Sequence, residues 1–412
     1  MRDFNFLMTT RIVFNNDLAK GIQDAREFLG VKKAVIMTDP GVAVLPIMKE
    51  LKDAMDAIDF PYELYADVKP NPTDVTVTKA AEVLRASDAD VVIGFGGGSA
   101  IDTASAAALL KTNGGIISDY YGMHKVKVKP LPQIMITTTA GSGAEITQFI
   151  SITDTVNKTK AQIGSPLCIP PVAVLCPEML KNSPETVTAE AGFDALAHCV
   201  EGYIGRKANP ITDAIALKAF GLISQNLLEF VNDPNNKDAA SAMILAASMS
   251  TMVASNIGTG DGHNIGRAIG GRFDIGHGTT LAVLLPHVLA FNLEEASEKL
   301  ADCARTMGID TDGMKDEDAA KQCILAIQSL RDDLKLPDNF KDYGMTIDQE
   351  SLDSIVENSI KSNQVGASAG SAPRVASRED FIRICKDTYE GKKIAFIKKG
   401  RKIIAVVGYK VT

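Results

Sequence analysis

Three short runs rich in valine and isoleucine mark the first half of the chain, at residues 34–37, 90–93 and 133–136, and each leads into a turn of polar residues or glycine. Helical stretches at 78–86 and 100–111 lie between them, and the second is rich in alanine and leucine. Apolar strands that alternate with helices are typical of a parallel sheet covered on both faces. This pattern predicts an α/β fold for the first half of the chain.

The second half has a different pattern, because long helical stretches replace the strands. The clearest of them cover residues 189–203, 212–231 and 238–255. We therefore predict two domains, an α/β domain at 1–182 and an all-α helical domain at 183–391.

Residues 392–412 form a basic C-terminal extension with seven basic residues and no acidic one. Two β-like runs, at 394–397 and 403–407, lie on either side of Gly400 and predict a hairpin at a sheet edge. We expect the charge to keep this edge solvated rather than to bind nucleic acid.

The composition restricts the partners and the compartment. The chain has 412 residues, 45% hydrophobic and 23% charged, so it can bury a large core. A net charge of −8 argues against nucleic acid as the main partner. The sequence shows neither a signal peptide nor an apolar run of about 18 residues, so we expect a soluble cytoplasmic protein without a membrane span. The six cysteines include no C-x-x-C pair, and we expect reduced thiols.

A glycine-rich segment, Gly96-Gly97-Gly98-Ser99, joins the second strand to the helix that follows. Glycines at such a place let the backbone approach a phosphate, and the helix N-terminus offers free N–H groups and the positive end of its dipole. The segment departs from the G-x-G-x-x-G fingerprint, because Ser99 occupies the last glycine position. An ordinary strand–helix turn with Ser99 as the N-cap is the alternative interpretation.

A second segment repeats this arrangement at the end of the third strand, where Thr137–Gly143 combines hydroxyl groups with glycines. Parallel strands bring their C-terminal ends to one edge of the sheet, where ligands bind, so the two segments together favour a dinucleotide. Asp39, at the end of the first strand, would accept a hydrogen bond from a ribose 2′-hydroxyl and repel a 2′-phosphate, which favours NAD over NADP. A turn aspartate before Pro40 is the alternative.

Histidine is scarce, and three of the five histidines lie in contexts that suit a metal site. Asp194 and His198, four residues apart, share one helix face. His263 and His277 lie in glycine-rich segments, but unbroken helix would hold them about 21 Å apart. We expect Gly270-Gly271 to break that helix and let both histidines reach one ion. Three imidazoles and one carboxylate suit Zn²⁺ or Fe²⁺, whereas each histidine alone would more simply be a hydrogen-bonded core residue.

Four spaced motifs together resemble the iron-containing (group III) alcohol dehydrogenases, over about residues 5–390. The motifs are Gly96–Asp102, Thr138–Glu145, Ala191–His198, and Gly276–Gly278 with Leu284–His287. The resemblance implies a Rossmann-like, dinucleotide-binding domain followed by a helical, metal-binding domain, with cofactor and metal in the cleft between them. It also implies NAD and a divalent metal as cofactors, with Fe²⁺ favoured and Zn²⁺ as the alternative, and a homodimer or larger homo-oligomer.

The resemblance assigns roles to individual residues. The metal ligands that it implies are Asp194, His198, His263 and His277. The residues that match family positions near the cofactor are Asp39, Gly97, Gly98, Ser99, Thr138, Thr139 and Lys160, while Asn71 and Phe149 match looser cofactor or pocket positions. Lys160 would also serve catalysis, by stabilising the pyrophosphate or a developing oxyanion, unless it is an ordinary solvated lysine.

Arg267 departs from the family pattern, in which many relatives have a second histidine four residues after the third metal ligand. That histidine is a candidate proton relay, and arginine cannot take its place because it stays protonated. The final proton would then come from water or a ribose hydroxyl of the cofactor. Because Arg267 shares a helix face with His263, we hypothesise that it binds a carboxylate or sulfonate of the substrate. A structural or surface arginine is the alternative.

These observations together predict an NAD(H)- and metal-dependent alcohol dehydrogenase or aldehyde reductase that acts on a short aldehyde or alcohol. An anionic substrate of the sulfoacetaldehyde or succinic semialdehyde type follows from the hypothesis for Arg267. The alternatives are a neutral alcohol or diol dehydrogenase (butanol or propanediol type), a polyol dehydrogenase or cyclising synthase on the same scaffold, and a non-catalytic sensor that binds NAD or metal.

Overall fold

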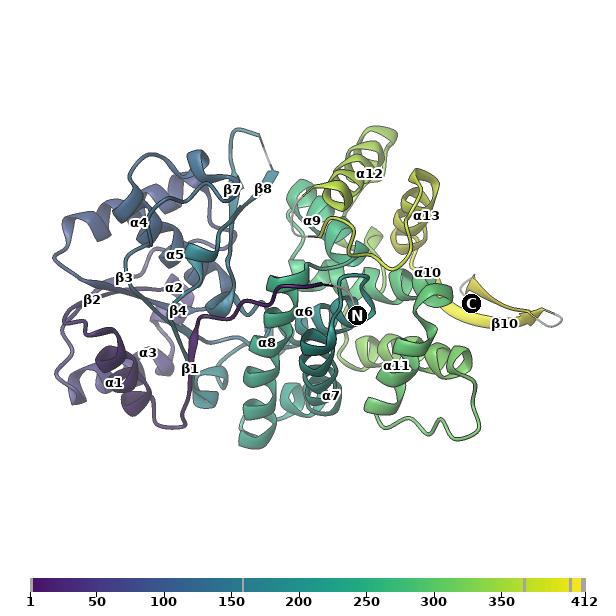
Figure 1. Ribbon diagram of the computed structural model, residues 1–412, viewed down its shortest axis with the longest axis horizontal. Helices are drawn as coiled ribbons and strands as arrows, with labels where there is room; N and C mark the ends of the chain where they lie inside the picture. Colours follow the sequence, from purple (N-terminus) through teal and green to yellow (C-terminus); the bar gives the residue numbers. More distant parts are fainter. Residues whose placement is uncertain (1–2, 158, 366–367, 400–401, 409–412) are drawn as a thin grey trace. The chain divides into compact units, whose positions relative to one another are not determined.

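The computed structural model describes residues 3–157, 159–365, 368–399 and 402–408, with the backbone alone at 397–399 and 402–408 (Figure 1). Residues 400, 401 and 409–412 of the basic extension therefore lie outside the described part of the chain.

Two compact units make up the chain. The first, which we call the sheet unit, comprises Phe6–Thr188 and Asp233–Ser255. The second, the helical unit, comprises Met1–Asn5, Ala189–Asn232 and Asn256–Thr412.

A six-stranded sheet, entirely parallel, forms the centre of the sheet unit, with the strand order β1-β9-β6-β4-β2-β3. The strands are β1 (Arg11–Phe14), β2 (Ala34–Met37), β3 (Tyr62–Tyr65), β4 (Val91–Gly96), β6 (Gln133–Thr137) and β9 (Val172–Leu175). The three strands predicted from sequence are β2, β4 and β6, and they are neighbours at the middle of the sheet. The predicted parallel α/β fold followed by a helical region is confirmed.

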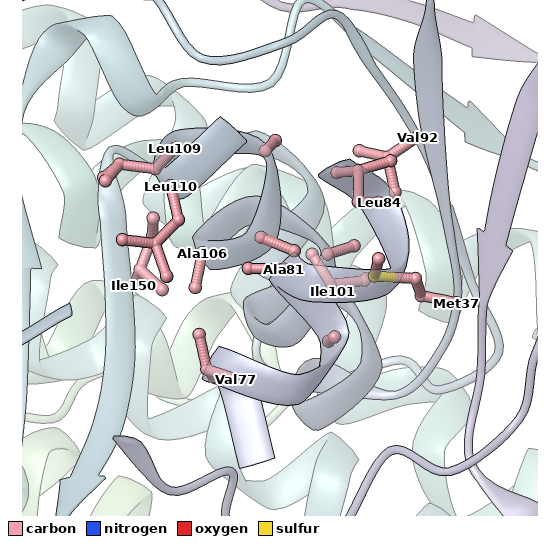
Figure 2. Packing of buried hydrophobic residues seen from close by; sticks show 14 of the residues in the cluster. Met37, Val77, Ala81, Leu84, Val92, Ile101, Ala106, Leu109, Leu110 and Ile150 are labelled. Carbon is pink, nitrogen blue, oxygen red and sulfur yellow. The ribbon is translucent and has the colours of Figure 1, made fainter. Parts of the chain in front are cut away.

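Helices cover both faces of this sheet. Successive residues of a strand point to opposite sides, so a strand that is buried at every position needs cover on both. Val35, Val92 and Met135 pack on one side with residues of α4 and α5. Figure 2 labels Val92 of this cluster together with Leu84 and Ile101. Ile36 and Ile93 pack on the other side with residues of α1 and α3. The helices of residues 1–113 are α1 (Leu18–Leu29), α2 (Pro40–Ala43), α3 (Pro46–Ala57), α4 (Asp74–Ala86) and α5 (Gly98–Asn113).

A smaller three-stranded sheet, in the order β5-β8-β7, belongs to the same unit. Its strands are β5 (Gly122–Met123), β7 (Phe149–Asp154) and β8 (Thr159–Gly164), and β7 and β8 pair antiparallel. The buried residues of β7, Ile150 and Ile152, pack into the core around α4 and α5, which leaves the other face of the hairpin more exposed.

The sequence-based prediction places residues 233–255 in the helical domain. In the structure these residues, which contain most of α8 (Lys237–Ile257), belong to the sheet unit. The physical reason is a set of long-range hydrogen bonds. Ser248 donates to Glu145 (2.5 Å), and Thr251 donates to the carbonyl of Ser142 (2.9 Å). A helical pattern in the sequence cannot reveal which unit a helix joins.

The helical unit packs its apolar residues around α9, α10, α12 and α13, with Ile265, Leu284 and Phe381 among those buried. The helices of the second half other than α8 are α6 (Glu185–Ile204), α7 (Pro210–Asn232), α9 (Asp261–Phe273), α10 (His277–Thr306), α11 (Asp316–Asp333), α12 (Gln349–Gln364) and α13 (Arg378–Tyr389).

Residues of the basic extension form an antiparallel pair, β10 (Lys393–Lys399) and β11 (Lys402–Gly408). The base of this pair contacts α11, where the side chain of Gln328 accepts from the N–H of Ile394 and donates to its carbonyl.

By length and composition, α7 and α8 would be long and apolar enough to cross a membrane, although no uninterrupted apolar run was found in the sequence. Much of their most apolar windows is buried inside the protein, 44% and 67% respectively, as in the core helices of globular proteins.

Candidate active site

The carboxyl ends of β2, β4 and β6 lie side by side, because these parallel strands are hydrogen-bonded neighbours. This edge carries six of the residues that the sequence places near a cofactor: Asp39, Gly97, Gly98, Ser99, Thr138 and Thr139. Ligands of open α/β sheets bind at this edge.

Gly96 and Gly97, in the turn after β4, differ in their backbone angles and in the space that a side chain would have. Gly96 has φ +147°, which side chains rarely allow, and a Cβ there would lie 2.8 Å from that of Ala100. Gly97 has ordinary angles, and a Cβ there would lie 3.4 Å from Oγ1 of Thr139. Gly97 is the N-cap of α5 and supplies no side-chain acceptor, so no cap side chain occupies the N–H groups at the start of this helix.

The two carboxylate oxygens of Asp39 lie in different environments. Oδ1 accepts from the N–H of Val42 at 2.9 Å and caps α2, as the turn interpretation expected. Oδ2 lies 3.5 Å from the point where a Cβ on Gly96 would stand, so it faces the glycine turn.

Asn71 and Lys160 extend this group of residues. Asn71, with φ +49°, donates its backbone N–H to Oγ of Ser99 (3.3 Å), so Ser99 accepts from a loop instead of capping its own helix. Lys160, an exposed residue of β8, donates from Nζ to Oδ1 of Asn71 (3.3 Å). Phe149 lies on the same hairpin, half-buried and paired in register with Gly164.

A carboxylate and three imidazoles converge inside the helical unit. Oδ1 of Asp194 lies 3.4 Å from Nε2 of His263, 3.7 Å from Nε2 of His277 and 3.9 Å from Nδ1 of His198. Potential ligand atoms of Asp194, His263 and His277 all lie within 4.8 Å of one another. His198 is outside that tight trio, but its ring stacks on His263 with the centroids 4.4 Å apart.

Three polar atoms at this point of convergence lack hydrogen-bond partners. Oδ1 of Asp194, Nδ1 of His198 and Nε2 of His263 are buried and unpartnered. A buried polar atom without a partner costs about 1–3 kcal/mol, and a cation bound among these atoms would satisfy all three. Nitrogen and carboxylate donors in this number suit Fe²⁺ or Zn²⁺, so the residues present fit a divalent metal.

Burial and charge set the protonation of the cluster. Burial lowers the pKa of His198 to about 4, which keeps its lone pair available. Burial opposes ionisation of Asp194, but the surrounding imidazoles hold the pKa of this carboxyl below its ordinary value. A neutral imidazole and an ionised carboxylate are the forms that bind metals.

The chain reaches His277 by a different route from the one expected. Helix α9 continues through Gly270 and Gly271 and ends only at Phe273, so the predicted break at the two glycines is wrong. The reversal comes at Asp274, which has φ +54°, and α10 begins at His277 itself. A single left-handed residue after the helix is enough to turn the chain, and helix-weakening glycines inside it are tolerated.

Glu201 is the residue of this site that sequence reasoning missed. It lies on α6 with Asp194 and His198, at a spacing (i, i+4, i+7) that brings all three to one helix face. Its carboxylate is 2.5 Å from Nδ1 of His263. The spacing was the available signal, but many carboxylates occur at such intervals by chance.

Arg267 lies one turn after His263 on α9 and is half-buried. Its Nη2 donates to Oδ1 of Asn264 (2.6 Å) and to Oγ of Ser368 (3.3 Å). Both partners are neutral, and within the described residues no carboxylate forms an ion pair with it. The guanidinium also contributes, after burial and other charges, to the lowered pKa of His198, so its charge is felt at the cluster.

The fold and the two groups of residues define an α/β protein with a sheet edge suited to a nucleotide and a separate helical unit with a buried metal-type cluster. The family model described as iron-containing alcohol dehydrogenase matches residues 9–177, and that of the Fe-containing alcohol dehydrogenase family, C-terminal, matches residues 188–389.

Individual relatives agree with these matches. The chain is 31% identical to the NAD-dependent methanol dehydrogenase of Bacillus methanolicus, over 93% of this chain and 99% of that protein. A solved 1,3-propanediol oxidoreductase superposes with a TM-score of 0.89 at 31% identity, over 94% and 100% of the two chains. The sulfoacetaldehyde reductase of Bifidobacterium kashiwanohense, solved with NAD⁺, gives 0.82 at 26% identity, over 94% and 99%.

The chain belongs to the iron-containing alcohol dehydrogenase family. It is therefore an enzyme, an oxidoreductase of the alcohol dehydrogenase class.

Proposed function

We propose that this enzyme interconverts a short aldehyde and its primary alcohol, with NAD(H) as the hydride carrier and a divalent metal, Fe²⁺ before Zn²⁺, at the histidine cluster. The observation that carries the proposal is the convergence of three imidazoles on Asp194 with unpartnered buried atoms at the centre. The ligands would be Asp194, His198, His263 and His277.

The choice of NAD rests on the edge of the parallel sheet. The N-terminus of α5 would receive the pyrophosphate, with Gly97, Gly98 and Ser99 against it and Thr138 and Thr139 beside them. Asp39 would accept from the ribose 2′-hydroxyl through the oxygen that faces Gly96. The same negative charge disfavours the 2′-phosphate of NADP.

Two residues near this edge have more specific proposed roles. Lys160, which Asn71 holds through a hydrogen bond, would place its positive charge near the pyrophosphate or a developing oxyanion. Phe149 would contribute an apolar wall to the cofactor pocket.

The chemistry that a bound metal supplies is polarisation of the carbonyl and stabilisation of the negative charge on its oxygen, while the nicotinamide supplies the hydride. The protein contributes burial and orientation. Asp194 is 6% exposed and His263 1% exposed, so water has little access to these two ligands. Arg267 stays protonated and cannot relay a proton, so water or a ribose hydroxyl would complete the alcohol.

For the substrate, we propose an aldehyde with a carboxylate or sulfonate, of the succinic semialdehyde or sulfoacetaldehyde type. The supporting observation is the guanidinium of Arg267, whose hydrogen-bond partners Asn264 and Ser368 are both neutral. An arginine without a carboxylate partner keeps charge and donors for an anion. A neutral alcohol or diol is the second candidate, favoured by the likeness to the methanol and propanediol enzymes.

Steady-state assays that follow NADH oxidation would test the proposal. Protein purified without oxygen and stripped of metal would receive Fe²⁺ or Zn²⁺, and then a panel of neutral, hydroxylated and anionic short aldehydes. We expect turnover only after metal is restored, a preference for NADH over NADPH, and loss of turnover in His263→Ala. Metal-loaded protein that binds NADH but reduces no aldehyde would overturn the proposal in favour of a different reaction on this scaffold.

We also propose that the enzyme is cytoplasmic and, on the strength of the resemblance, that it acts as a homodimer or larger homo-oligomer. Light scattering on a sizing column would test the assembly, and a monomer at assay concentration would contradict it.

A further inference from the structure

We infer that Glu201 is a positioning residue that fixes the tautomer and orientation of His263, and that the Gly260-Asp261-Gly262 segment is shaped to hold its carboxylate. The inference rests on the proposed metal site, because it assigns His263 the part of a ligand. It concerns a residue that does not itself belong to the ligand set.

Glu201 is buried, with 3% of its surface exposed, and its two oxygens accept three hydrogen bonds. Oε2 lies 2.5 Å from Nδ1 of His263 and accepts from the N–H of Gly260 at 3.1 Å. Oε1 accepts from the N–H of Gly262 at 2.7 Å. Two backbone N–H groups fix the orientation of the carboxylate. Because the imidazole of His263 is hydrogen-bonded to this carboxylate, the orientation of its ring is fixed as well.

This arrangement decides which nitrogen of His263 carries the proton. A neutral imidazole has one N–H, and a carboxylate at Nδ1 accepts it. Nε2 is then left with a lone pair, 3.4 Å from Oδ1 of Asp194, and both atoms are unpartnered. Burial opposes protonation of His263, but the carboxylates of Glu201 and Asp194 raise its pKa, so a cation that binds at Nε2 displaces a proton from that nitrogen. Glu201 thus holds the proton of Nδ1 and leaves Nε2 as the nitrogen for the metal.

The glycines next to His263 are explained by the same carboxylate. A Cβ on Gly260 would lie 2.7 Å from Oε1 of Glu201, and one on Gly262 would also lie 2.7 Å from that oxygen. Gly260 has negative φ, so its backbone angles do not require glycine. These positions lack side chains because the carboxylate occupies the space.

Glu201 also lies at the N-terminal end of α9, where Gly260 is the N-cap and offers no side chain. A negative charge there interacts favourably with the helix dipole and occupies N–H groups that have no intrahelical acceptor. One carboxylate of α6 therefore sets the start of α9 and, through it, the place of His263.

The test is metal affinity, measured without cofactor or substrate. A glutamine at this position keeps an oxygen for Gly262, but its amide donates toward Nδ1 and so requires the proton of His263 on Nε2. We expect Glu201→Gln to weaken Zn²⁺ and Co²⁺ binding by about 10- to 100-fold in competition with a coloured chelator. Glu145→Gln is the matched control, because Glu145 is a buried carboxylate of the sheet unit bonded to the hydroxyl of Ser248. An affinity within twofold of wild type in Glu201→Gln would overturn the inference.

A double-mutant cycle distinguishes positioning from general stabilisation. If Glu201 acts through His263, the cost of Glu201→Gln in metal affinity should disappear when His263→Ala is already present. An undiminished cost in that background would show that Glu201 acts by another route, and the inference would fail.

One measurement needs no variant. In the zinc-loaded wild-type protein, ¹⁵N-resolved NMR of the imidazoles should show His263 with its proton on Nδ1. A metal bound at Nδ1, or a proton on Nε2, would contradict the inference even if every variant failed to fold. If zinc binding depends on Glu201 but the protein reduces no aldehyde, only the proposed reaction is contradicted. If Glu201→Gln shows normal turnover and an unchanged affinity for zinc, only this inference is contradicted.

Discussion

Nη2 of Arg267 donates a 2.6 Å hydrogen bond to Oδ1 of Asn264, three residues earlier on the same helix. The bond holds a half-buried guanidinium near the histidine cluster without neutralising its charge. Glu201 and Asp194 act on this charge without forming an ion pair with it, and an anion on the substrate would be a direct partner.

Removing that guanidinium should therefore change substrate preference. Hydrogen bonds to charged groups contribute about 1.5–3 kcal/mol, so Arg267→Ala should lower kcat/KM for succinic semialdehyde or sulfoacetaldehyde by about 10- to 100-fold relative to propanal. Arg272→Ala, on the same helix but paired with exposed Glu350, is the control and should leave kcat/KM unchanged for both the anionic aldehyde and propanal. An unchanged ratio in Arg267→Ala would mean that the arginine is structural.

Asp39 offers a test of cofactor choice in which the helix cap is preserved. Asparagine is also a good N-cap, so Asp39→Asn should keep the bond to Val42 and remove only the charge. Loss of the like-charge repulsion should raise kcat/KM for NADPH by about tenfold, with little change in melting temperature. Continued rejection of NADPH by the variant would argue that Asp39 is only a turn residue.

The two glycines after β4 should respond differently to alanine. Gly96→Ala forces a side chain into φ +147° and against Ala100, and should cost about 1–3 kcal/mol of unfolding free energy. Gly97→Ala meets only ordinary contacts, so its stability should stay within about 0.5 kcal/mol of wild type. If the turn holds a pyrophosphate, Gly97→Ala should still weaken NADH binding in calorimetry. Unaltered NADH affinity in this variant would remove Gly97 from the cofactor site.

His287, 5% exposed, should make stability depend on pH. Burial, opposed by Asp387, lowers the pKa of its ring to about 4. The unfolded chain, with an ordinary pKa near 6.5, therefore binds more protons below neutral pH, and stability falls as the pH drops through this range. The contribution lost by pH 5 is about 2 kcal/mol.

Denaturant unfolding of wild type and His287→Gln at pH 7.5 and pH 5 would check this value. The wild type should lose about 2 kcal/mol more than the variant, since the other titrating groups are common to both. Equal losses would show that His287 does not titrate in this range.

Local pattern was sufficient for much of the fold. Residues 34–37 and 133–136 were recognisable as strands because both faces of a central parallel strand are covered, so all of these residues except Gln133 are apolar. Asp194 and His198 were recognisable as a pair because four residues bring side chains to one helix face. Such signals need only the chain itself, since they depend on neighbours in sequence.

Long-range packing decided the rest. Helix α8 joined the sheet unit through Ser248 and Thr251, partners that no periodicity identifies. The reversal at Asp274 fell outside the glycines that suggested a break, because the conformation of one residue is set by the contacts around it. Glu201 became visible only when α6 and α9 were seen together. The sequence by itself determined which elements form and which side chains are candidates for the site, and only the tertiary structure decided which of them meet, because burial and charge act between residues that the chain holds far apart.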